Sequence, residues 1–333
     1  MTPGPTPGPT PAATPRHPVP THGLLAHVVR SGFVEGAHHG TAVALGADGR
    51  VVAQVGDPEA PIFPRSANKP LQAVAMLRAG LDLHGRLLAL ATSSHSGEHF
   101  HRDGVRRILA SVDLTEQALQ TPAELPAGVH EGALWRRTGR SPSAIAHNCS
   151  GKHAAMLATC VVNGWSTADY RDPGHPLQRQ IAETVAELTG FPVSATGVDG
   201  CGAPVLAVPP VGLARAFAAL ATATGGSAEH QVAQAIRTHP DWLGGTGRSV
   251  TSLLEAVPEA IAKDGAEGVF AAALPDGRAA VVKIADGAER ASVPVIAALL
   301  RRLGVDGEAL GELLDVPVIG DGRPVGRVEV VGI

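Results

Sequence analysis

Apolar and polar positions alternate in short runs near both ends of the chain, whereas the middle has the spacing of helices. Residues 24–56 contain apolar stretches around the sequence GADG, and residues 268–287 contain two more around PDG. Because Asp-Gly turns between β-prone runs are typical of hairpins, each stretch predicts one hairpin. Apolar residues at helical spacing predict helices over 66–80 and 292–304, and residues 81–240 are mostly helical in pattern.

This order of elements predicts a mixed α/β fold of the α+β kind. The two hairpins near the chain ends are expected to join in a single antiparallel sheet, covered by the first and the last helix. The helical middle is expected to form a lobe beside that sheet. A site would then lie in the crevice between the sheet and the lobe, where ligand sites commonly form.

The composition fits a folded domain preceded by a tail. With 333 residues, of which 44% are hydrophobic and 17% charged, the chain can bury a large core, and we expect a soluble, globular protein. Residues 1–22 are rich in Pro and Thr and predict a disordered tail, so that the catalytic domain spans residues 23–333. The net charge of −4, without a basic block, argues against nucleic acid and membranes as partners. No apolar run approaches the roughly 20 residues of a membrane-spanning helix.

Lysine is scarce in this chain. Of the 27 Lys and Arg residues only four are lysines, at positions 69, 152, 263 and 283. A nucleotide-composition bias accounts for the general preference for arginine. Each remaining lysine is nevertheless a candidate for chemistry, because a buried lysine can release its proton and a guanidinium cannot.

The segment RSANKP, residues 65–70, carries a Ser-x-x-Lys motif at the expected start of a helix. Residues at i and i+3 share one helix face, so the Lys69 amine is expected to take the Ser66 hydroxyl proton. The alternative is that Ser66 is only an N-cap. The motif occurs once, uses one of four lysines and follows the first hairpin, which favours catalysis. A second polar segment, ATSSHSGEHFH at 91–101, is expected either to deliver a second hydroxyl or to cap the next helix.

Three cysteines are too few for a disulfide framework, and their odd number predicts a reducing cytoplasm. Cys149 lies with Lys152 and His153 in HNCSGKH, and Cys201 lies in the Gly-rich segment VDGCGAP. Together these residues could bind a metal ion, and a set of buried free thiols is the alternative. Cys160, on the apolar side of a helix, is expected to be such a buried thiol.

Several segments, in this order, resemble the serine–lysine asparaginases of the rhizobial inducible type, the asparaginase II family: RSANKP, SHSGE, NCSGKH, DGC and GVFAAAL with VVKIADG. The resemblance covers about residues 24–330 and implies a fold similar to serine β-lactamases and glutaminases. This agrees with the predicted sheet and lobe. The N-terminal Thr-Gly-Gly-Thr signature of the threonine asparaginases is absent, and GGTG at 244–247 lies too far along the chain to be that motif.

The resemblance implies roles for individual positions. The implied residues are Ser66, Lys69, Ser94 and Lys263 for catalysis; Asp199, His95 and Arg65 for substrate binding; and Cys149, Lys152 and Cys201 for zinc. The zinc ion is expected to tune affinity or structure and not to be obligatory for the chemistry. The family can carry a cysteine in the stretch that matches GRSVT, where this chain has Val250.

We therefore expect a cytoplasmic, homodimeric amidohydrolase that converts the small molecule L-asparagine to L-aspartate and ammonia. Ser66 or Ser94 would form the acyl-enzyme, with Lys69 and Lys263 as proton carriers. Burial beside a second ammonium would lower the pKa of a lysine from about 10.4 to roughly 7–8, as a base near neutral pH requires. The alternatives are a glutaminase, because one methylene changes transition-state binding by only about 1–3 kcal/mol, a penicillin-recognising hydrolase of the same fold, and a non-catalytic zinc-binding protein.

Overall fold

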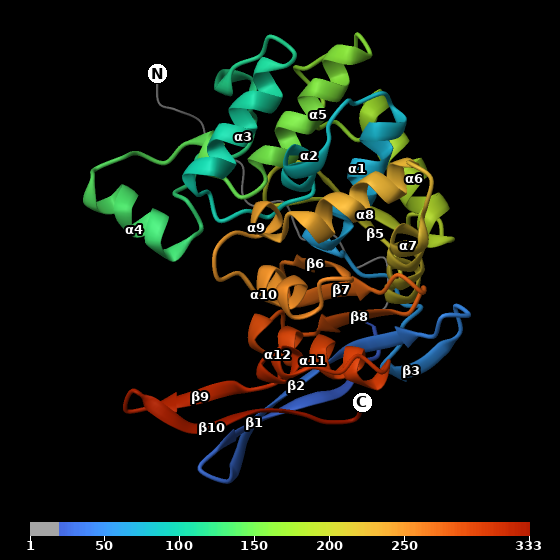
Figure 1. Ribbon diagram of the computed structural model, residues 1–333, viewed down its shortest axis with the longest axis vertical. Coiled ribbons are helices and arrows are strands. Elements are labelled where there is room, and N and C mark those ends of the chain that lie inside the picture. The colour runs from blue at the N-terminus through green and yellow to red at the C-terminus, as the bar shows by residue number, and fades with distance from the viewer. Residues whose placement is uncertain (1–19) are drawn as a thin grey trace, which may run out of the picture.

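The computed structural model describes residues 20–333, so residues 1–19 of the predicted tail lie outside it. Within the described residues, eight strands form one antiparallel sheet in the order β6-β7-β8-β2-β1-β10-β9, with β3 paired to β2 (Figure 1). The strands are β1 (Gly23–Arg30), β2 (Phe33–Leu45), β3 (Val51–Val55), β6 (Ile261–Gly265), β7 (Val269–Ala273), β8 (Ala279–Ile284), β9 (Val316–Gly320) and β10 (Arg323–Val330). The two ends of the chain meet inside this sheet, because β2 pairs with β8 and β1 pairs with β10.

Both predicted hairpins are present. The GADG turn joins β2 to β3, and the PDG turn joins β7 to β8. The hairpin β9–β10 and the strand β6 were not indicated by the pattern. In β9 and β10 only Val318 and Val328 are buried, so these strands lack the alternation that identifies a strand with one face in the core.

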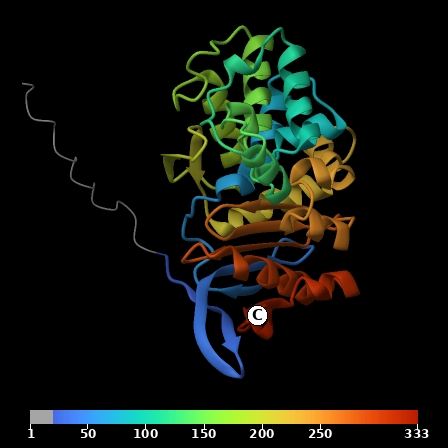
Figure 2. The same cartoon turned by 90° about the vertical axis from the view of Figure 1, so that its left-hand side faces the viewer.

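The middle of the chain forms a helical lobe on one side of the sheet, and the last two helices lie on the other side (Figures 1 and 2). The helices are α1 (Lys69–Arg78), α2 (Gly85–Ala91), α3 (His99–Ala110), α4 (Val129–Arg137), α5 (Ser150–Val162), α6 (Pro176–Thr189), α7 (Pro210–Thr222), α8 (Ala228–Thr238), α9 (Pro240–Leu243), α10 (Ser249–Ala256), α11 (Glu289–Arg302) and α12 (Glu308–Glu312). The lobe also contains a small hairpin of β4 (Ala195–Val198) and β5 (Pro204–Ala207). None of the described helices is both long and apolar enough to cross a lipid bilayer.

The predicted architecture of a sheet flanked by helices beside a helical lobe is confirmed, with one correction. Helices α7 and α11 both pack on β7 and β8, whose residues are buried throughout except for the partly exposed Lys283. The prediction that the first helix covers the sheet is wrong, because α1 packs chiefly against α5, α6 and α8. Residues 69–76 of α1 are all buried, and a helix that is buried all round belongs in the centre of a lobe.

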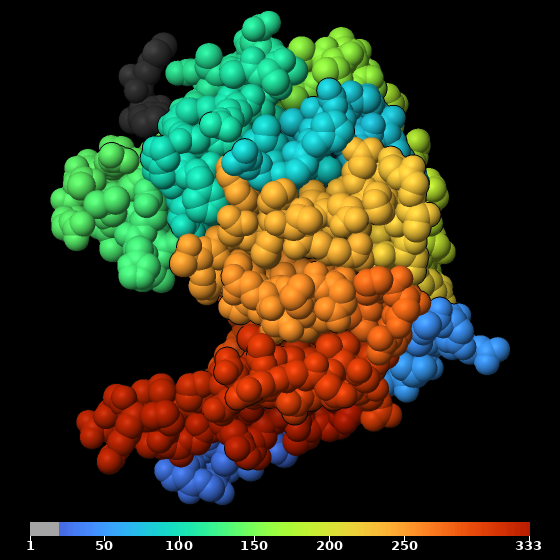
Figure 3. All heavy atoms as spheres, viewed as in Figure 1, coloured from blue at the N-terminus to red at the C-terminus, as the bar shows by residue number. Residues whose placement is uncertain are grey.

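The lobe and the sheet adjoin at the edge strand β6. The short 3₁₀ helix η1 (Arg65–Asn68), which leads into α1, packs against β6 and β7. A side chain at Gly265 would overlap the Pro64 carbonyl oxygen, so glycine is required for this close approach. Figure 3 shows that one side of the molecule is hollowed between the segment around α4 and the β9–β10 hairpin.

Candidate active site

Lys69 is the first residue of α1, and its side chain is completely buried. Its ammonium donates hydrogen bonds to the Ser93 carbonyl oxygen at 2.5 Å, to Ser94 Oγ at 3.0 Å and to Cys149 Sγ at 3.1 Å. Three acceptors match the three N–H bonds of a protonated lysine. They come from the loop after α2 and from the N-cap of α5, so Lys69 joins three separate segments at one point.

Ser66 lies in η1, one 3₁₀ turn before Lys69. Residues at i and i+3 eclipse one another in a 3₁₀ helix, so the two side chains share a face. The structure nevertheless gives Lys69 a hydrogen bond to Ser94 and none to Ser66. Ser66 is half-buried, and its hydroxyl makes no hydrogen bond with any residue in the described part of the chain. The preceding Arg65 has a left-handed φ of 52°, which is uncommon outside glycine and places Ser66 after a strained residue.

Lys263 lies on β6, and its side chain is also completely buried. Its Nζ donates to the Asp264 carbonyl oxygen at 2.8 Å and contacts the Asp264 carboxylate. Burial, helped by the nearby charge of Lys69 and opposed by Asp264, lowers the pKa of Lys263 to about 8. This environment agrees with the predicted one, a buried amine beside a second ammonium. Asp264 is not among the predicted site residues, because neighbours on a strand normally point to opposite faces.

Arg65 and Asp199, both predicted to bind substrate, are brought together and form an ion pair. Arg65 Nε donates to Asp199 Oδ1 at 2.7 Å, and Arg65 Nη1 lies 3.8 Å from Glu267 Oε1. Burial acts to raise the pKa of Asp199, but the positive charges of Lys152 and Arg65 outweigh it and hold that pKa below its ordinary value. Asp199 is therefore a carboxylate at neutral pH, and it is held by Arg65, the first residue of η1.

His95, the third predicted substrate ligand, is completely buried and hydrogen-bonded within the protein. The Gly97 N–H donates to His95 Nδ1 at 3.0 Å, so the ring proton resides on Nε2, which lies 3.0 Å from Ser150 Oγ. The ring also stacks on His101, with centroids 4.9 Å apart. These contacts fix the loop that carries Ser94 and leave neither ring nitrogen free for a substrate.

The three predicted metal ligands lie close together, and one of them, Cys149, also contacts Lys69. The buried thiols of Cys149 and Cys201 pack together, and Lys152 Nζ donates to Cys201 Sγ at 3.2 Å. A hydrogen bond from Cys201, together with the ammonium groups of Lys69 and Lys152, holds the pKa of Cys149 well below its ordinary value. Burial acts to lower the pKa of Lys152, but the charges of Cys201, Cys149 and Asp199 outweigh it and raise that pKa.

One buried nitrogen beside this cluster has no partner. His153 Nδ1 lies 2.6 Å from the Tyr170 hydroxyl, whereas His153 Nε2 makes no hydrogen bond with any described residue. Burial lowers the pKa of His153 to about 4, so its imidazole is neutral, as a metal ligand requires. The described residues contain no group of three His, Cys, Asp or Glu side chains placed to hold a metal ion. A metal site here therefore depends on the amine of Lys152.

The end of α9 and the loop that joins it to α10 are hydrogen-bonded to the Ser94 segment. The Ser94 N–H donates to the Leu243 carbonyl at 3.1 Å, and the Ser96 N–H donates to the Gly244 carbonyl at 2.8 Å. Val250, at the position where the family can carry a cysteine, is buried on α10. A side chain at Gly244 would meet Val250 at 2.8 Å, so Val250 packs directly beneath this loop and presents no polar group to the site.

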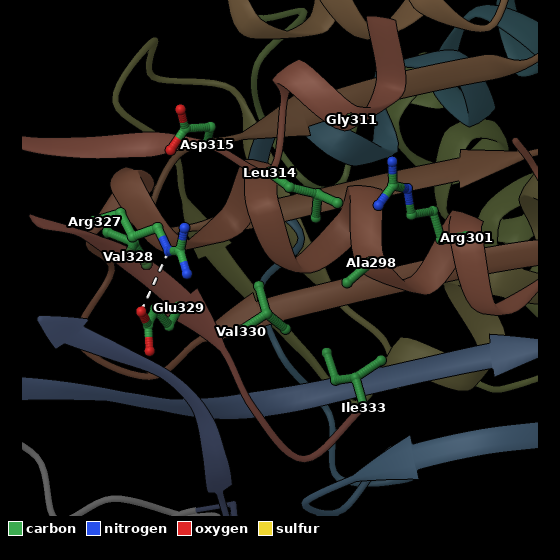
Figure 4. Close-up of a pocket in the computed structure, with 10 residues that line it drawn as sticks. All are labelled: Ala298, Arg301, Gly311, Leu314, Asp315, Arg327, Val328, Glu329, Val330 and Ile333. Carbon is green, nitrogen blue, oxygen red and sulfur yellow. Dashed lines mark hydrogen bonds and ion pairs between the residues drawn. The ribbon is translucent and has the colours of Figure 1, made fainter. Parts of the chain in front are cut away.

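A groove of about 620 Å³ lies away from these residues, between α11, α12 and the end of the chain (Figure 4). It is lined by Ala298, Arg301, Gly311, Leu314, Asp315, Arg327, Val328, Glu329, Val330 and Ile333. None of the predicted site residues lines it. Lys69, Ser94 and the nearby Lys263 are therefore the candidate active site on chemical grounds.

The sequence profile of the L-asparaginase II family matches residues 26–330. The chain belongs to the L-asparaginase II family. Membership confirms the resemblance predicted over about residues 24–330 and assigns the chain to the hydrolases. No curated protein sequence matches this member of the family.

Solved structures that are similar to this L-asparaginase II family member include β-lactamases. A candidate β-lactamase from Bacteroides dorei is 12% identical, with a TM-score of 0.47 over 79% of this chain and 92% of that one. A β-lactamase from Mycobacterium bovis is 16% identical, with a TM-score of 0.43 over 80% and 95% of the two chains. The protein Mglu is 17% identical, with a TM-score of 0.43 over 81% and 68%.

Proposed function

We propose that this chain hydrolyses L-asparagine to L-aspartate and ammonia through an acyl-enzyme. The observation that supports this most directly is a completely buried lysine, Lys69, placed 3.0 Å from the Ser94 hydroxyl and one 3₁₀ turn after Ser66. Serine becomes a nucleophile when an adjacent base takes its proton, and a lysine amine that has given up its extra proton can be that base. Membership in the L-asparaginase II family supports an amide as the substrate.

In the proposed reaction Ser66 attacks the side-chain amide carbon, since its hydroxyl is half-exposed and unengaged. The Lys69 ammonium first passes one proton through the Ser94 hydroxyl to a neutral Lys263, and the Lys69 amine then takes the Ser66 proton as the tetrahedral intermediate forms. Lys69 then returns a proton through the Ser94 hydroxyl to the amide nitrogen, the C–N bond breaks and ammonia leaves. Water attacks the resulting ester through the same relay in reverse, which releases aspartate and restores Ser66. Lys263 holds the proton that it took up through Ser94 and returns it by the same path to Lys69 at the end of the cycle.

Asp199 is proposed to receive the α-ammonium of the substrate. Its carboxylate stays ionised at neutral pH and is only 12% exposed, so it offers a desolvated negative charge next to η1. Arg65 orients this carboxylate through the 2.7 Å hydrogen bond and links it to the backbone turn that carries Ser66. Binding of the α-ammonium at Asp199 thus places the substrate relative to the nucleophile.

The rate is expected to depend on pH through Lys263. In the proposed relay Lys263 must be neutral to accept the Ser94 proton, and with a pKa of about 8 it is mostly protonated at pH 7. The value of kcat/KM should therefore rise as the pH increases through about 8 and level off above it. Profiles of the parent and of Lys263→Met measure this, and the limb near pH 8 should be missing from the variant. An unchanged limb would assign the titration to another group.

We also propose that Cys149, Lys152 and Cys201 bind a zinc ion. The residues fit such an ion, because two adjacent thiols and the amine of Lys152 form a buried set of the sulfur and nitrogen donors that zinc prefers. Lys152 must lose its proton to coordinate, so binding is expected to release protons. A bound zinc would supply a fixed positive charge behind the substrate pocket, and no proton transfer in the reaction above passes through it.

Elemental analysis of purified protein tests the zinc site. Cys149→Ser and Cys201→Ser should each lose most of the zinc, because a serine hydroxyl is a poor substitute for a thiolate. Cys160→Ser is the matched control, since Cys160 is equally buried but has no part in the cluster. Zinc contents that match the parent in all three variants would show that these cysteines bind no metal.

An ammonia-release assay on asparagine, glutamine and nitrocefin in parallel tests the function itself. We expect turnover of asparagine and slower turnover of glutamine, because the added methylene changes transition-state binding by about 1–3 kcal/mol. Nitrocefin, whose cleavage is followed by colour, should not be cleaved. Faster glutamine turnover would identify a glutaminase, nitrocefin cleavage a penicillin-recognising hydrolase, and no reaction a non-catalytic protein.

A homodimer and a cytoplasmic location belong to the same proposal. Phe33, at the tip of the β1–β2 hairpin, is 72% exposed, and Ile319 on the adjacent β9–β10 hairpin is 52% exposed. Contiguous exposed apolar patches mark protein–protein contact sites, and we place the proposed subunit interface at these two hairpins. The three cysteines are all unpaired, as expected of a chain that works in a reducing compartment.

A further inference from the structure

Arg248 is an arginine beside the catalytic cluster whose guanidinium has unused hydrogen-bonding capacity. Its side chain is 30% exposed and donates no hydrogen bond to any residue that the structure describes. Its nearest carboxylate oxygen is Asp264 Oδ2, at 3.6 Å from Nη2, and the same carboxylate contacts Lys263 more closely. A guanidinium has five N–H donors in a planar arrangement that suits a carboxylate, so Arg248 can accept a further anionic partner.

Arg65, the other arginine near the site, does not have this free hydrogen-bonding capacity. It donates to Asp199 at 2.7 Å, and a second carboxylate, that of Glu267, lies 3.8 Å away. Its charge is therefore balanced by two protein carboxylates. Because a carboxylate substrate would have to displace Asp199 from Arg65, Arg248 is the better placed cation for an incoming anion.

The backbone holds Arg248 in a fixed relation to Ser94. Arg248 ends the α9–α10 loop as the N-cap of α10, and its N–H donates to the Gly245 carbonyl at 3.3 Å. The last residue of α9 and the first residue of this loop accept hydrogen bonds from the Ser94 and Ser96 backbone. Thr246 donates from its N–H and its hydroxyl to the Glu98 carboxylate, at 2.8 Å and 3.0 Å. In Figure 1 the loop between α9 and α10 runs along the hollowed side that Figure 3 shows.

The charges around Ser94 favour an anion. Three basic groups, Lys69, Lys263 and Arg248, stand against two acidic groups, the Asp264 carboxylate and the Cys149 thiol, so the cluster has more basic than acidic groups. Asp199, which Arg65 holds beside η1, provides a negative charge. A zwitterionic amino acid presents an ammonium and a carboxylate on one carbon, and this distribution of charge can receive both.

We propose that Arg248 binds the α-carboxylate of the substrate and thereby restricts the enzyme to amides that carry a free α-carboxylate. This inference rests on the proposed asparaginase function and adds a specificity-determining residue to it. Arg248 takes no part in proton transfer. Its removal is expected to weaken substrate binding and to leave the acyl-transfer chemistry intact for a substrate that lacks the carboxylate.

The test compares asparagine with β-alaninamide, which is asparagine without the α-carboxylate. Ammonia release is measured for the parent, Arg248→Gln, Arg248→Lys and the control Arg50→Gln, whose arginine is exposed on the β2–β3 turn. For Arg248→Gln, kcat/KM for asparagine should fall by about 100-fold, mainly through KM, and kcat/KM for β-alaninamide should stay within about threefold of the parent. Arg248→Lys should recover part of the loss, and Arg50→Gln should match the parent with both substrates.

Equal losses with both substrates in Arg248→Gln, or no loss with asparagine, would overturn the proposal. Calorimetric binding of L-aspartate gives a readout that does not require turnover. The parent should bind L-aspartate and Arg248→Gln should bind it about 100-fold more weakly, and equal affinities would again contradict the role of Arg248. A parent that binds L-aspartate but releases no ammonia from asparagine would refute the proposed function and leave the carboxylate site standing.

Discussion

Replacing Ser66 with alanine is expected to reduce ammonia release from asparagine by at least about 10⁴-fold, because no acyl-enzyme can form without the attacking hydroxyl. The fold should be unaffected, since this hydroxyl makes no hydrogen bond with a described residue and is only half-buried. Steady-state kinetics measure the loss. Mass spectrometry of acid-quenched turnover mixtures should show a covalent adduct in the parent and none in Ser66→Ala.

The variant Ser94→Ala is needed to decide which of the two serines is the nucleophile. It removes the hydroxyl that lies 3.0 Å from Lys69 but leaves the proposed nucleophile in place. We expect the adduct to form, with turnover slowed by about 10²-fold because the leaving group receives its proton less efficiently. The opposite pattern, an adduct in Ser66→Ala and none in Ser94→Ala, would make Ser94 the nucleophile.

Lys69→Arg is expected to be almost as inactive as Lys69→Ala. Arginine keeps the positive charge, but it cannot take a proton from serine, and general base catalysis typically supplies 10²- to 10⁴-fold. The site around Lys69 is completely buried, so the larger guanidinium also has to displace neighbours. Measuring kcat/KM for asparagine, with circular dichroism as the check on folding, decides the matter. If kcat/KM of Lys69→Arg lay within a few-fold of the parent value, Lys69 would contribute only its positive charge.

Lys283→Arg is the matched control for that experiment. Lys283 Nζ donates to the carbonyl oxygens of Glu267 at 2.5 Å and Ile284 at 2.7 Å, and it has no hydrogen bond to either candidate serine. Its side chain is partly exposed, and an arginine can satisfy the same carbonyls. We expect a clearly smaller loss than in Lys69→Arg. A comparable loss would mean that Lys283 takes part in the reaction.

The scarcity of lysine was the most informative feature of the sequence. Lys69, Lys152 and Lys263 are completely buried, although lysine is among the residues least often buried. A chain that uses arginine elsewhere retains lysine where a compact amine must fit in the interior. The hairpins and the central helix were predictable for a similar reason, because their apolar periodicity is set by burial on one or both faces.

The contacts inside the site could not be predicted from the sequence. Arg65 and Asp199 are 134 residues apart, and Lys69 and Cys149 are 80 apart, so only the folded chain shows that they meet. Sequence spacing favoured Ser66 as the partner of Lys69, but the Lys69 amine makes its hydrogen bond to Ser94, in the loop after α2. Arg248 was not predicted either, because one arginine among many gives no local signal.

The position of β1 in the sheet has a consequence for how the chain folds. β1 lies between β2 and β10, and Ala26 is paired with Val330, so the contact order of the sheet is high. β1 begins at residue 23 and β10 at residue 323, so β1 is synthesised long before its second neighbour exists, and such long-range pairing is slow. A product truncated before β10 would leave β1 as an unpaired edge, which is a template for intermolecular association. Assembly of the sheet thus depends on a strand that is synthesised long after the strand with which it pairs.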